Sequence, residues 1–232
     1  MNTTEVLSLL EEHKNERGIA NWNKLHPNKN KLKSFGIGLT QLRKLAKKIG
    51  RDHELALELW KSEYYDARII SLLIDDPKLI TQEQAEMQVD QLKGGHLAHV
   101  FSSCDATLAK TPFTKELADR WIVSDDLMRK QCGYGLLYEL SKSKKKSAPD
   151  NKYFLSQIKY IEESFKKESI PIKMSMGGAL LGMGKRNLEL HGPALKVAQM
   201  MGPIDFDKRG KCDPFDVAKN LNSVYVKEKF GI

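Results

Sequence analysis

The sequence has few cysteines, no long apolar stretch, and none of the alternation of apolar and polar residues that marks β-strands. Its three cysteines, Cys104, Cys132 and Cys212, show no C-x-x-C spacing, which argues against a disulfide framework or a zinc site. No apolar run approaches the roughly 18–20 residues that cross a bilayer. The first residues have no basic segment before an apolar core, which argues against a signal peptide. We therefore expect a cytoplasmic protein with reduced thiols and no membrane partner.

Motifs of several enzyme classes are also missing. The chain contains no G-x-x-x-x-G-K-[ST] loop, no glycine fingerprint that follows a strand, and no H-E-x-x-H. His96 and His99 stand three residues apart on an expected helix and could bind a metal or a phosphate. Such pairs are more often solvated or partly buried, so we expect no metal and no cofactor.

Acidic residues are missing from one long stretch near the N-terminus. The whole chain has 38 Lys+Arg against 30 Asp+Glu, a net charge of +8, but residues 18–51 contain nine Lys or Arg and no acid. Residues 52–90 reverse this balance, and positive charge returns at 142–146, 185–187 and 208–211. This segregation favours a face that binds a polyanion over a surface that is merely solvated.

Nearly every segment has helical periodicity or a helix cap. Thr40 is the expected N-cap and Gly50 the stop of one basic helix, Thr81 with Gln84 forms a capping box, and Asp213–Pro214 is expected to open the last helices. The other predicted helices cover residues 3–13, 53–61, 65–74, 81–94, 96–109, 114–122, 125–141, 151–167, 172–184 and 188–201. The sequence therefore predicts an all-α fold.

Two glycine-rich stretches repeat each other at an offset of 44 residues. RKQCGYGLL (129–137) aligns with KMSMGGALL (173–181), which places Arg129 on Lys173 and Gly133 on Gly177. A fainter echo aligns Trp60 with Trp121. Helix pairs that recur about every 40 residues are typical of an α-α superhelix, a solenoid of HEAT-like antiparallel pairs.

The glycines of this repeat have two explanations. In a stack of helix pairs the second helices usually line the concave surface, so Arg129 and Lys173 would emerge at equivalent places near helix N-termini, which suit phosphate. Gly133, Gly177 and Gly178 could serve tight packing between helices, or they could let a ligand backbone approach. Each mid-helix glycine lowers stability by about 0.5–1 kcal/mol relative to alanine. Tight packing or the approach of a ligand should offset this loss.

The order of these features resembles the bacterial DNA alkylation repair family, the HEAT-like alkylpurine DNA glycosylases of the AlkD type. The resemblance covers residues 34–200 and rests on GIGLTQLRKLAKKIG, ELALELWKSEYYDARIISLLIDDPKLIT, LAKTP, RKQCGYGLLYEL and GGALLGMGKRN. It implies a right-handed superhelix that cradles duplex DNA against a basic concave face. It also implies one domain over 1–232, with an N-terminal helix and basic loop (1–35), repeats (36–201) and C-terminal capping helices (202–232).

The residues that the family uses for catalysis are not matched. Active members use two Trp, one Asp and one Arg, whose rings and carboxylate stabilise the positive sugar as the N-glycosidic bond breaks. The family Arg falls at Gln131, the later Trp at Gly178, and the earlier Trp and Asp within LKGGHLAHVFSS (92–103). The substitute catalytic candidates are His96, His99, Asp105, Gln131 and Tyr134, although Tyr134 is also expected as a buried anchor. Trp60 and Trp121 are expected in the core.

The sequence thus predicts a monomer that binds double-stranded DNA and possesses, in one interpretation, alkylpurine DNA glycosylase activity on 3- or 7-alkylpurines. In the alternative interpretation it is a non-catalytic HEAT-repeat scaffold for DNA structures or a protein partner. The residues expected to contact DNA phosphates are Arg43, Lys44, Lys47, Lys48, Arg129, Lys130, Lys173, Lys185 and Arg186.

Overall fold

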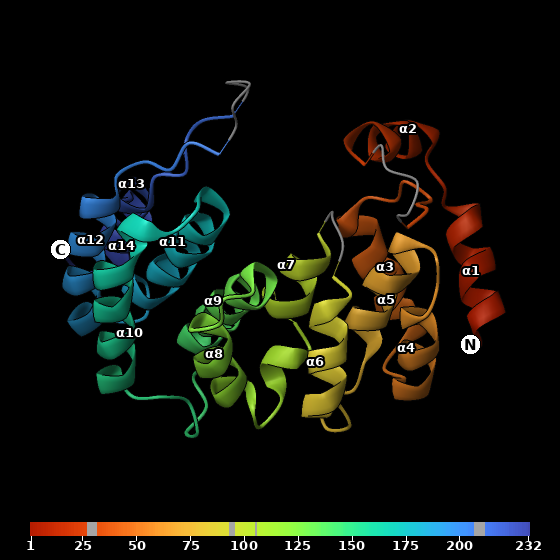
Figure 1. Cartoon of the computed structure of the whole chain (residues 1–232), viewed down its shortest axis with the longest axis horizontal. Helices are drawn as coiled ribbons and strands as arrows, with labels where there is room; N and C mark the ends of the chain where they lie inside the picture. Colours follow the sequence, from red (N-terminus) through yellow and green to blue (C-terminus); the bar gives the residue numbers. More distant parts are fainter. Residues whose placement is uncertain (27–31, 93–95, 105, 207–211) are drawn as a thin grey trace. The chain divides into compact units, whose positions relative to one another are not determined.

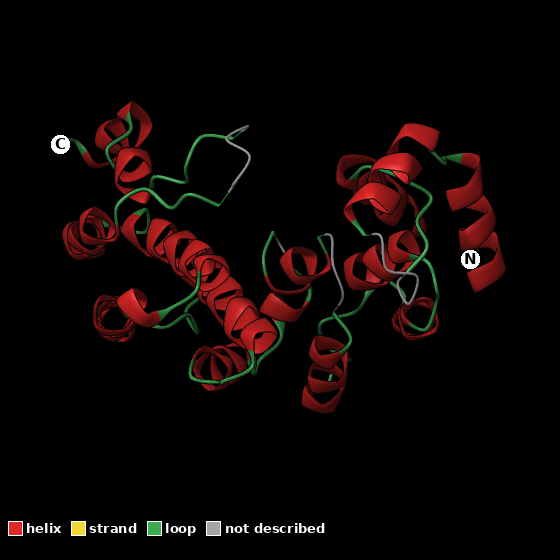
Figure 2. Cartoon of the chain, turned by 45° about the horizontal axis from the view of Figure 1, so that its top comes forward, coloured by secondary structure: helices red, strands yellow, loops and turns green. Residues whose placement is uncertain are grey.

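All the regular elements that the structure describes are helical. The computed structural model describes residues 1–26, 32–92, 96–104, 106–206 and 212–232. Within these ranges two isolated bridges, Lys33 with Tyr64 and Ile204 with Phe215, are the only β-type pairings (Figure 1, Figure 2). The predicted all-α class is confirmed.

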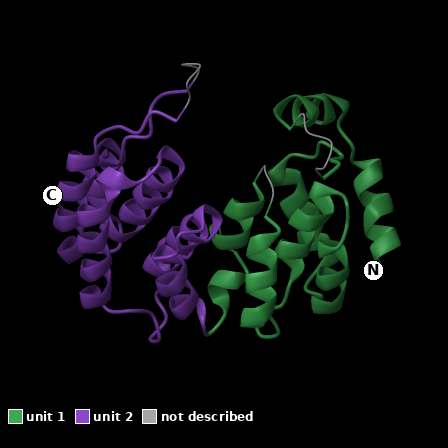
Figure 3. Cartoon of the chain, in the orientation of Figure 1, with its two compact units in different colours: residues 1–112 green, residues 113–232 purple. Residues whose placement is uncertain are grey.

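The chain divides into two compact units, residues 1–112 and residues 113–232 (Figure 3). Each unit has its own hydrophobic core, which includes Leu45, Leu59 and Ile70 in the first unit and Trp121, Leu136 and Leu180 in the second. The prediction of one domain over 1–232 remains a prediction.

Unit 1 is built on a helix hairpin whose apolar faces meet in the core. Asp52 caps α4, because its side chain accepts the amide hydrogen of Leu55, and Trp60 at the end of α4 is only 2% exposed. The helices of this unit are α1 (Thr3–Glu12), α2 (Glu16–Leu25), α3 (Leu39–Ile49), α4 (His53–Trp60), α5 (Tyr65–Ile74), α6 (Gln82–Asp90), α7 (Leu97–Ser102) and the 3-10 turn η1 (Leu108–Lys110). Helix α5 packs against α3, α4 and α7.

A buried carboxylate fixes the segment that leads into α3. Asp66 on α5 is fully buried and accepts hydrogen bonds from the Ser34 hydroxyl (2.8 Å) and from the amides of Phe35 (2.8 Å) and Ile37 (3.1 Å). Burial raises the pKa of Asp66, and these three hydrogen bonds oppose that shift. The start of α3 is therefore held by α5.

Unit 2 contains two long helices that lie side by side. They are α9 (Leu127–Lys142) and α11 (Ile170–Gly184). Helix α8 (Thr114–Ile122) precedes α9 as its hairpin partner, and α10 (Asn151–Ser164) precedes α11 and packs mainly on the helix that follows α11. A 3-10 turn η2 (Phe165–Lys167) follows α10, and the unit ends with α12 (Leu188–Met201), α13 (Val217–Leu221) and α14 (Val224–Phe230). The two halves of the 44-residue echo are therefore the second helices of successive helix pairs.

Several predicted boundaries are wrong. The N-cap of α3 is Gly38 rather than Thr40, and α13 is capped by Asp216 rather than opened by Asp213–Pro214. The helix expected over 96–109 ends at Ser102, because Cys104 has a φ of 59° that a right-handed helix cannot accommodate. Thr81 does cap α6, but the Gln84 side chain donates to Asp75 (2.7 Å).

Candidate nucleic-acid interface

Charge is sorted by helix layer within each unit. We use the term second layer for α3, α5 and α7 of unit 1 and for α9 and α11 of unit 2, and first layer for α4, α6, α8 and α10. Helix α3 carries four cations and no acid. Helix α4 carries two acids and α6 carries three, and neither of them has a Lys or Arg. In unit 2, α9 and α11 carry more cations than acids, and α8 and α10 are balanced. Helix α5 carries one acid and one cation and α7 carries neither, so positive charge gathers on α3, α9 and α11 of the second layer.

The strongest basic surface is the solvent side of α3. Leu42, Leu45 and Ala46 are buried, and the opposite side presents exposed side chains at Arg43, Lys44, Lys47 and Lys48. Spacings of i and i+4 place Arg43 beside Lys47 and Lys44 beside Lys48, and each like-charged pair costs roughly 0.2–0.5 kcal/mol. Among the described residues, none of the three lysines has an ion pair, so the surface lacks an internal counter-charge.

The guanidinium of Arg43 contacts the Sγ atom of Cys104, which follows α7. This contact places the α3 basic surface beside the end of α7, in agreement with the packing of both helices on α5.

In unit 2 the predicted cations lie at the N-terminal ends of the second-layer helices. Arg129 is in the first turn of α9, where its amide donates to the Asp126 cap (2.8 Å), and Lys173 is in the first turn of α11; both are half-buried. Lys130 differs, because its Nζ atom forms an ion pair with Glu168 (2.9 Å) and its side chain is 16% exposed. This internal partner makes Lys130 a poorer phosphate ligand than Lys173.

Three glycines of these helices serve packing. A Cβ atom at Gly133 would lie 2.7 Å from the backbone nitrogen of Ile122 in α8, and one at Gly177 would lie 2.9 Å from the side chains of Phe215 and Val217. At Gly182 it would meet the Ser141 hydroxyl on α9. The tight-packing explanation is thus confirmed for Gly133 and Gly177.

Gly178 has the other environment. No atom lies within 4 Å of the position where its Cβ would be. It stands five residues, about 7.5 Å along the helix axis, from Lys173. The two neighbouring glycines of α11 therefore differ: Gly177 packs against the core, as the tight-packing explanation requires, and Gly178 leaves an open surface that a ligand backbone could approach.

The two remaining predicted cations lie at the other end of α11. The Nη1 atom of Arg186 donates to the carbonyl oxygens of Ser141 (2.8 Å) and Ser143 (2.7 Å), and its guanidinium lies 5.0 Å from the ring centre of Phe154. Lys185 is the C-cap of α11 and its own carbonyl accepts from Lys229 (2.5 Å). Arg186 therefore has a structural role in closing α9.

The predicted substitute catalytic residues do not form one cluster within the described part of the chain. His96 and His99 are exposed, at the cap and in the body of the short helix α7, and the His96 amide donates to the buried hydroxyl of Tyr65 (2.9 Å). Burial raises the pKa of Tyr65 to about 12, so this phenol stays neutral. Asp105 lies outside the described residues.

Gln131 and Tyr134 differ in their exposure. Gln131 is half-buried on α9, while Tyr134 is 0% exposed and its pKa is raised by burial. A fully buried ring cannot stack on a nucleotide, so Tyr134 is the buried anchor and is removed from the catalytic candidates. Trp60 and Trp121, 2% and 1% exposed, belong to the core as predicted.

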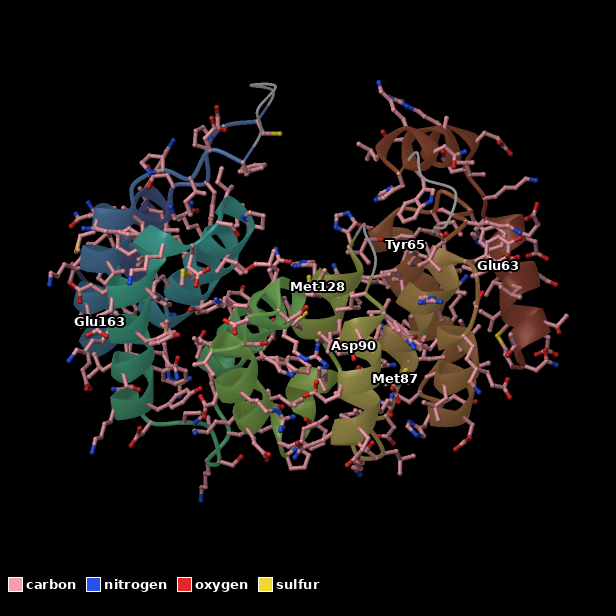
Figure 4. All side chains as sticks on the ribbon, in the orientation of Figure 1. Glu63, Tyr65, Met87, Asp90, Met128 and Glu163 are labelled. Carbon is pink, nitrogen blue, oxygen red and sulfur yellow. The ribbon has the colours of Figure 1, made fainter. Side chains whose placement is uncertain are left out.

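The described second layer also lacks a suitable carboxylate for glycosidic bond cleavage. Asp66 is buried and holds the segment before α3, and Glu139 pairs with Lys142 (3.1 Å). Figure 4 labels Tyr65, the first residue of α5, and Met128, in the first turn of α9. Within the described ranges no three metal-binding side chains gather, and none of the helices there is long and apolar enough to cross a membrane.

One cationic site was missed by reasoning from sequence. A cavity of about 440 Å³ lies at the C-terminal ends of α9 and α11, and Lys142, Lys144 and Lys229 line it together with Lys185 and Arg186. The run KSKKK (142–146) was a signal for it, but Lys229 comes from the far end of the chain and only the fold brings it there.

Comparison with known proteins agrees with this architecture. A family model described as DNA alkylation repair enzyme matches residues 6–204. Uncharacterised proteins of Listeria innocua and Listeria monocytogenes are each 28% identical over 182 residues, which is 75% of this chain and 75% of each relative.

A solved structure has the same fold at low sequence identity. It is described as a new family of proteins related to the HEAT-like repeat DNA glycosylases with affinity for branched DNA structures, and it matches with a TM-score of 0.83. The match covers 100% of this chain and 97% of the other at 21% identity. The predicted HEAT-like fold is confirmed.

Proposed function

The chain belongs to the DNA alkylation repair enzyme family, and on that premise we propose that it binds DNA through the cations of its second layer. The observation that carries this proposal is the sorting of charge by layer: basic α3, α9 and α11 alternate along the chain with acidic or balanced first-layer helices. Phosphate contacts need cations that an incoming backbone can reach, and the α3 lysines meet that need.

The ligand that we propose is the phosphate backbone of DNA. Exposed Lys44, Lys47 and Lys48 supply charge without internal partners among the described residues, and Arg129 and Lys173 supply it at two helix N-termini, where the helix dipole adds to it. The solved structure with the same fold has affinity for branched DNA structures according to its description, which supports DNA as the ligand class here.

The test is charge reversal on α3. We expect Lys44→Glu with Lys47→Glu and Lys48→Glu to lower the affinity for a DNA duplex by roughly a hundredfold or more, because each charge-assisted contact contributes about 1.5–3 kcal/mol. Fluorescence anisotropy with a labelled duplex measures this loss.

A matched variant controls for the change in net charge. Lys61, Lys78 and Lys110 are exposed lysines of the same unit that lie outside the second layer. Their triple change to Glu should leave the affinity within about threefold of wild type, since distant exposed charges are screened. Equal losses in the two triple variants would contradict a defined interface.

Base excision is the second candidate function, because the family description is that of a repair enzyme. By the resemblance described above, Gln131 and Gly178 stand where the family has an Arg and a Trp, and residues 92–103 contain neither the earlier Trp nor the Asp. The described second-layer helices also offer no accessible carboxylate, so we propose binding as the principal activity. Incubation with duplex DNA that carries one 7-methylguanine tests this. Formation of abasic sites above the spontaneous rate would establish excision and direct mutagenesis to His96, His99, Asp105 and Gln131.

A further inference from the structure

A cationic cavity lies at the opposite end of α9 and α11 from Arg129 and Lys173. It has a volume of about 440 Å³ and is lined by Lys142, Lys144, Lys185, Arg186 and Lys229, together with Ser143 and Asn187. None of the lining side chains in the described part of the chain is a carboxylate. Five positive side chains thus converge on one hollow.

Part of this charge is used to close the helices. Arg186 donates through Nη1 to the carbonyls of Ser141 and Ser143, and Lys229 donates to the carbonyl of Lys185 (2.5 Å). Lys142 forms an ion pair with Glu139 (3.1 Å). These contacts explain why cations are present at helix C-termini, where unpaired carbonyls and the negative dipole end favour them.

The remaining charge exceeds that structural need. Glu139 offsets Lys142, and the C-terminal ends of α9 and α11 together contribute about −1 elementary charge, against the four other cations. Asn187, which also lines the cavity, is the N-cap of α12, so a positive dipole end opens there too. Neither Lys144 nor Lys185 has a described ion-pair partner. The hollow is therefore electropositive.

We propose that this cavity is a second phosphate-binding site and that it takes a phosphodiester of a second DNA arm when the protein binds a branched structure. The proposal rests on the DNA-binding function proposed above. Lys173 and Lys185 are separated by twelve residues of α11, about 18 Å along the axis, which is close to the width of a duplex. Helices α9 and α11 can then hold phosphates at both their N-terminal and C-terminal ends. A DNA junction has arms that run in different directions, so two of its arms could reach the two ends.

The rigidity of the site supports this use. Helices α9 and α11 approach so closely beneath the cavity that a Cβ atom at Gly182 would lie within 2.7 Å of the Tyr138 ring. A pocket built on two packed helices keeps its cations in place before the ligand arrives, which reduces the entropy cost of binding.

The experiment compares a three-way DNA junction with a linear duplex of the same total length, by anisotropy at one fixed salt concentration. For the wild type we expect at least tenfold tighter binding of the junction. For Lys144→Glu with Lys229→Glu, two cavity cations that lie outside the second-layer helices, we expect the junction affinity to fall to that of the duplex, while the duplex affinity changes by less than about threefold. Circular dichroism and the thermal midpoint verify folding.

The control is Lys159→Glu with Lys219→Glu, two exposed lysines of unit 2 that do not line the cavity. This variant has the same net charge and should keep the junction preference. An equal loss for junction and duplex in the cavity variant, or no loss for either, would overturn the assignment to a second arm. A wild type that binds neither DNA would instead overturn the proposed function itself.

A free polyphosphate could also supply the phosphate groups that the cavity binds. Calorimetric titration with inorganic tripolyphosphate separates the two: binding to the wild type that is lost in the cavity variant, with an unchanged junction preference, would assign the cavity to a free anion and contradict the DNA-arm proposal. Competition of tripolyphosphate with the junction alone, and not with the duplex, is the result that we expect.

Discussion

The second layer presents its positive charge differently in the two units. In unit 1 the cations occupy the whole solvent side of one amphipathic helix, α3, whose other side is buried. In unit 2 the middles of α9 and α11 are small or buried residues, and the cations stand at the helix ends, with Arg129 and Lys173 at one end and Lys185 and Arg186 at the other. The second layer therefore carries a continuous basic surface along α3 in unit 1. In unit 2 its cations lie at both ends of α9 and α11, and Gly178 between them is open to solvent.

This difference follows from packing. Helices α9 and α11 pack against each other, and Gly182 permits their close approach because a Cβ atom there would meet Tyr138 and Ser141 on α9. Gly133 permits the close approach of α9 to α8, and Gly177 that of α11 to Phe215 and Val217. Long side chains cannot fit at these contacts. Helix α3 keeps the side chains of one side exposed, at Arg43, Lys44, Lys47 and Lys48. Charge can be placed along a helix only where packing leaves a free side, and otherwise it must stand at the termini.

The largest effect that we expect in unit 2 comes from Arg129→Glu with Lys173→Glu. The double reversal should reduce duplex affinity by about a hundredfold or more, since it removes two charge-assisted contacts of about 1.5–3 kcal/mol each. The charge-matched pair Lys159→Glu with Lys219→Glu is the control. An affinity equal to that of the control would mean that only the α3 stripe holds DNA.

Gly133→Ala should destabilise unit 2 by about 3 kcal/mol, at the upper end for an overpacked site. The added Cβ meets backbone atoms of Ile122 and Trp121, which cannot move aside as a side chain can. Chemical denaturation followed by circular dichroism measures the free energy of unfolding. A neutral result would show that α8 and α9 can separate without cost.

Asp66→Asn should lower the free energy of unfolding by about 2 kcal/mol, because an amide has one acceptor oxygen where the carboxylate oxygens accept three hydrogen bonds from Ser34, Phe35 and Ile37. The variant also loosens the segment before α3, so a smaller loss of DNA affinity should accompany it. Unchanged stability would contradict the role assigned to this carboxylate.

Gly178→Ala should have the smallest effect and the opposite sign. No atom lies within 4 Å of the new Cβ, so the helical preference for alanine should stabilise the protein by about 0.5–1 kcal/mol. The same denaturation experiment compares it directly with Gly133→Ala. Destabilisation of both variants to the same degree would mean that the two glycines do not have different roles.

The sequence predicted the helices wherever caps and apolar periodicity agreed. Thr114–Ile122 was predicted with its observed bounds, and the 44-residue echo located two second helices. Helix α2 was missed, because Ile19, Trp22 and Leu25 are its only large apolar residues and none of its residues is buried. The early end of α7 depends on the positive φ of Cys104, which the residue types of this segment do not predict.

The sequence predicted which residues carry the positive charge of the interface, but not which of them have partners inside the protein. Lys44, Lys47 and Lys48 were identified from an acid-free run and remain exposed. Lys130 and Arg186 belong to equally basic motifs, yet their partners, Glu168 and Ser141, lie 38 and 45 residues away. Only the fold decides which cations are used internally and which are available to a ligand.

The most direct test of the central claim, that second-layer cations hold DNA phosphates, is the salt dependence of duplex binding. Each phosphate contact contributes about −0.9 to the slope of log K against log salt concentration. The account predicts a wild-type slope of about −4 or steeper, which becomes shallower by about 3 in the Lys44, Lys47 and Lys48 triple variant. A wild-type slope near zero, or the same slope in both proteins, would contradict it.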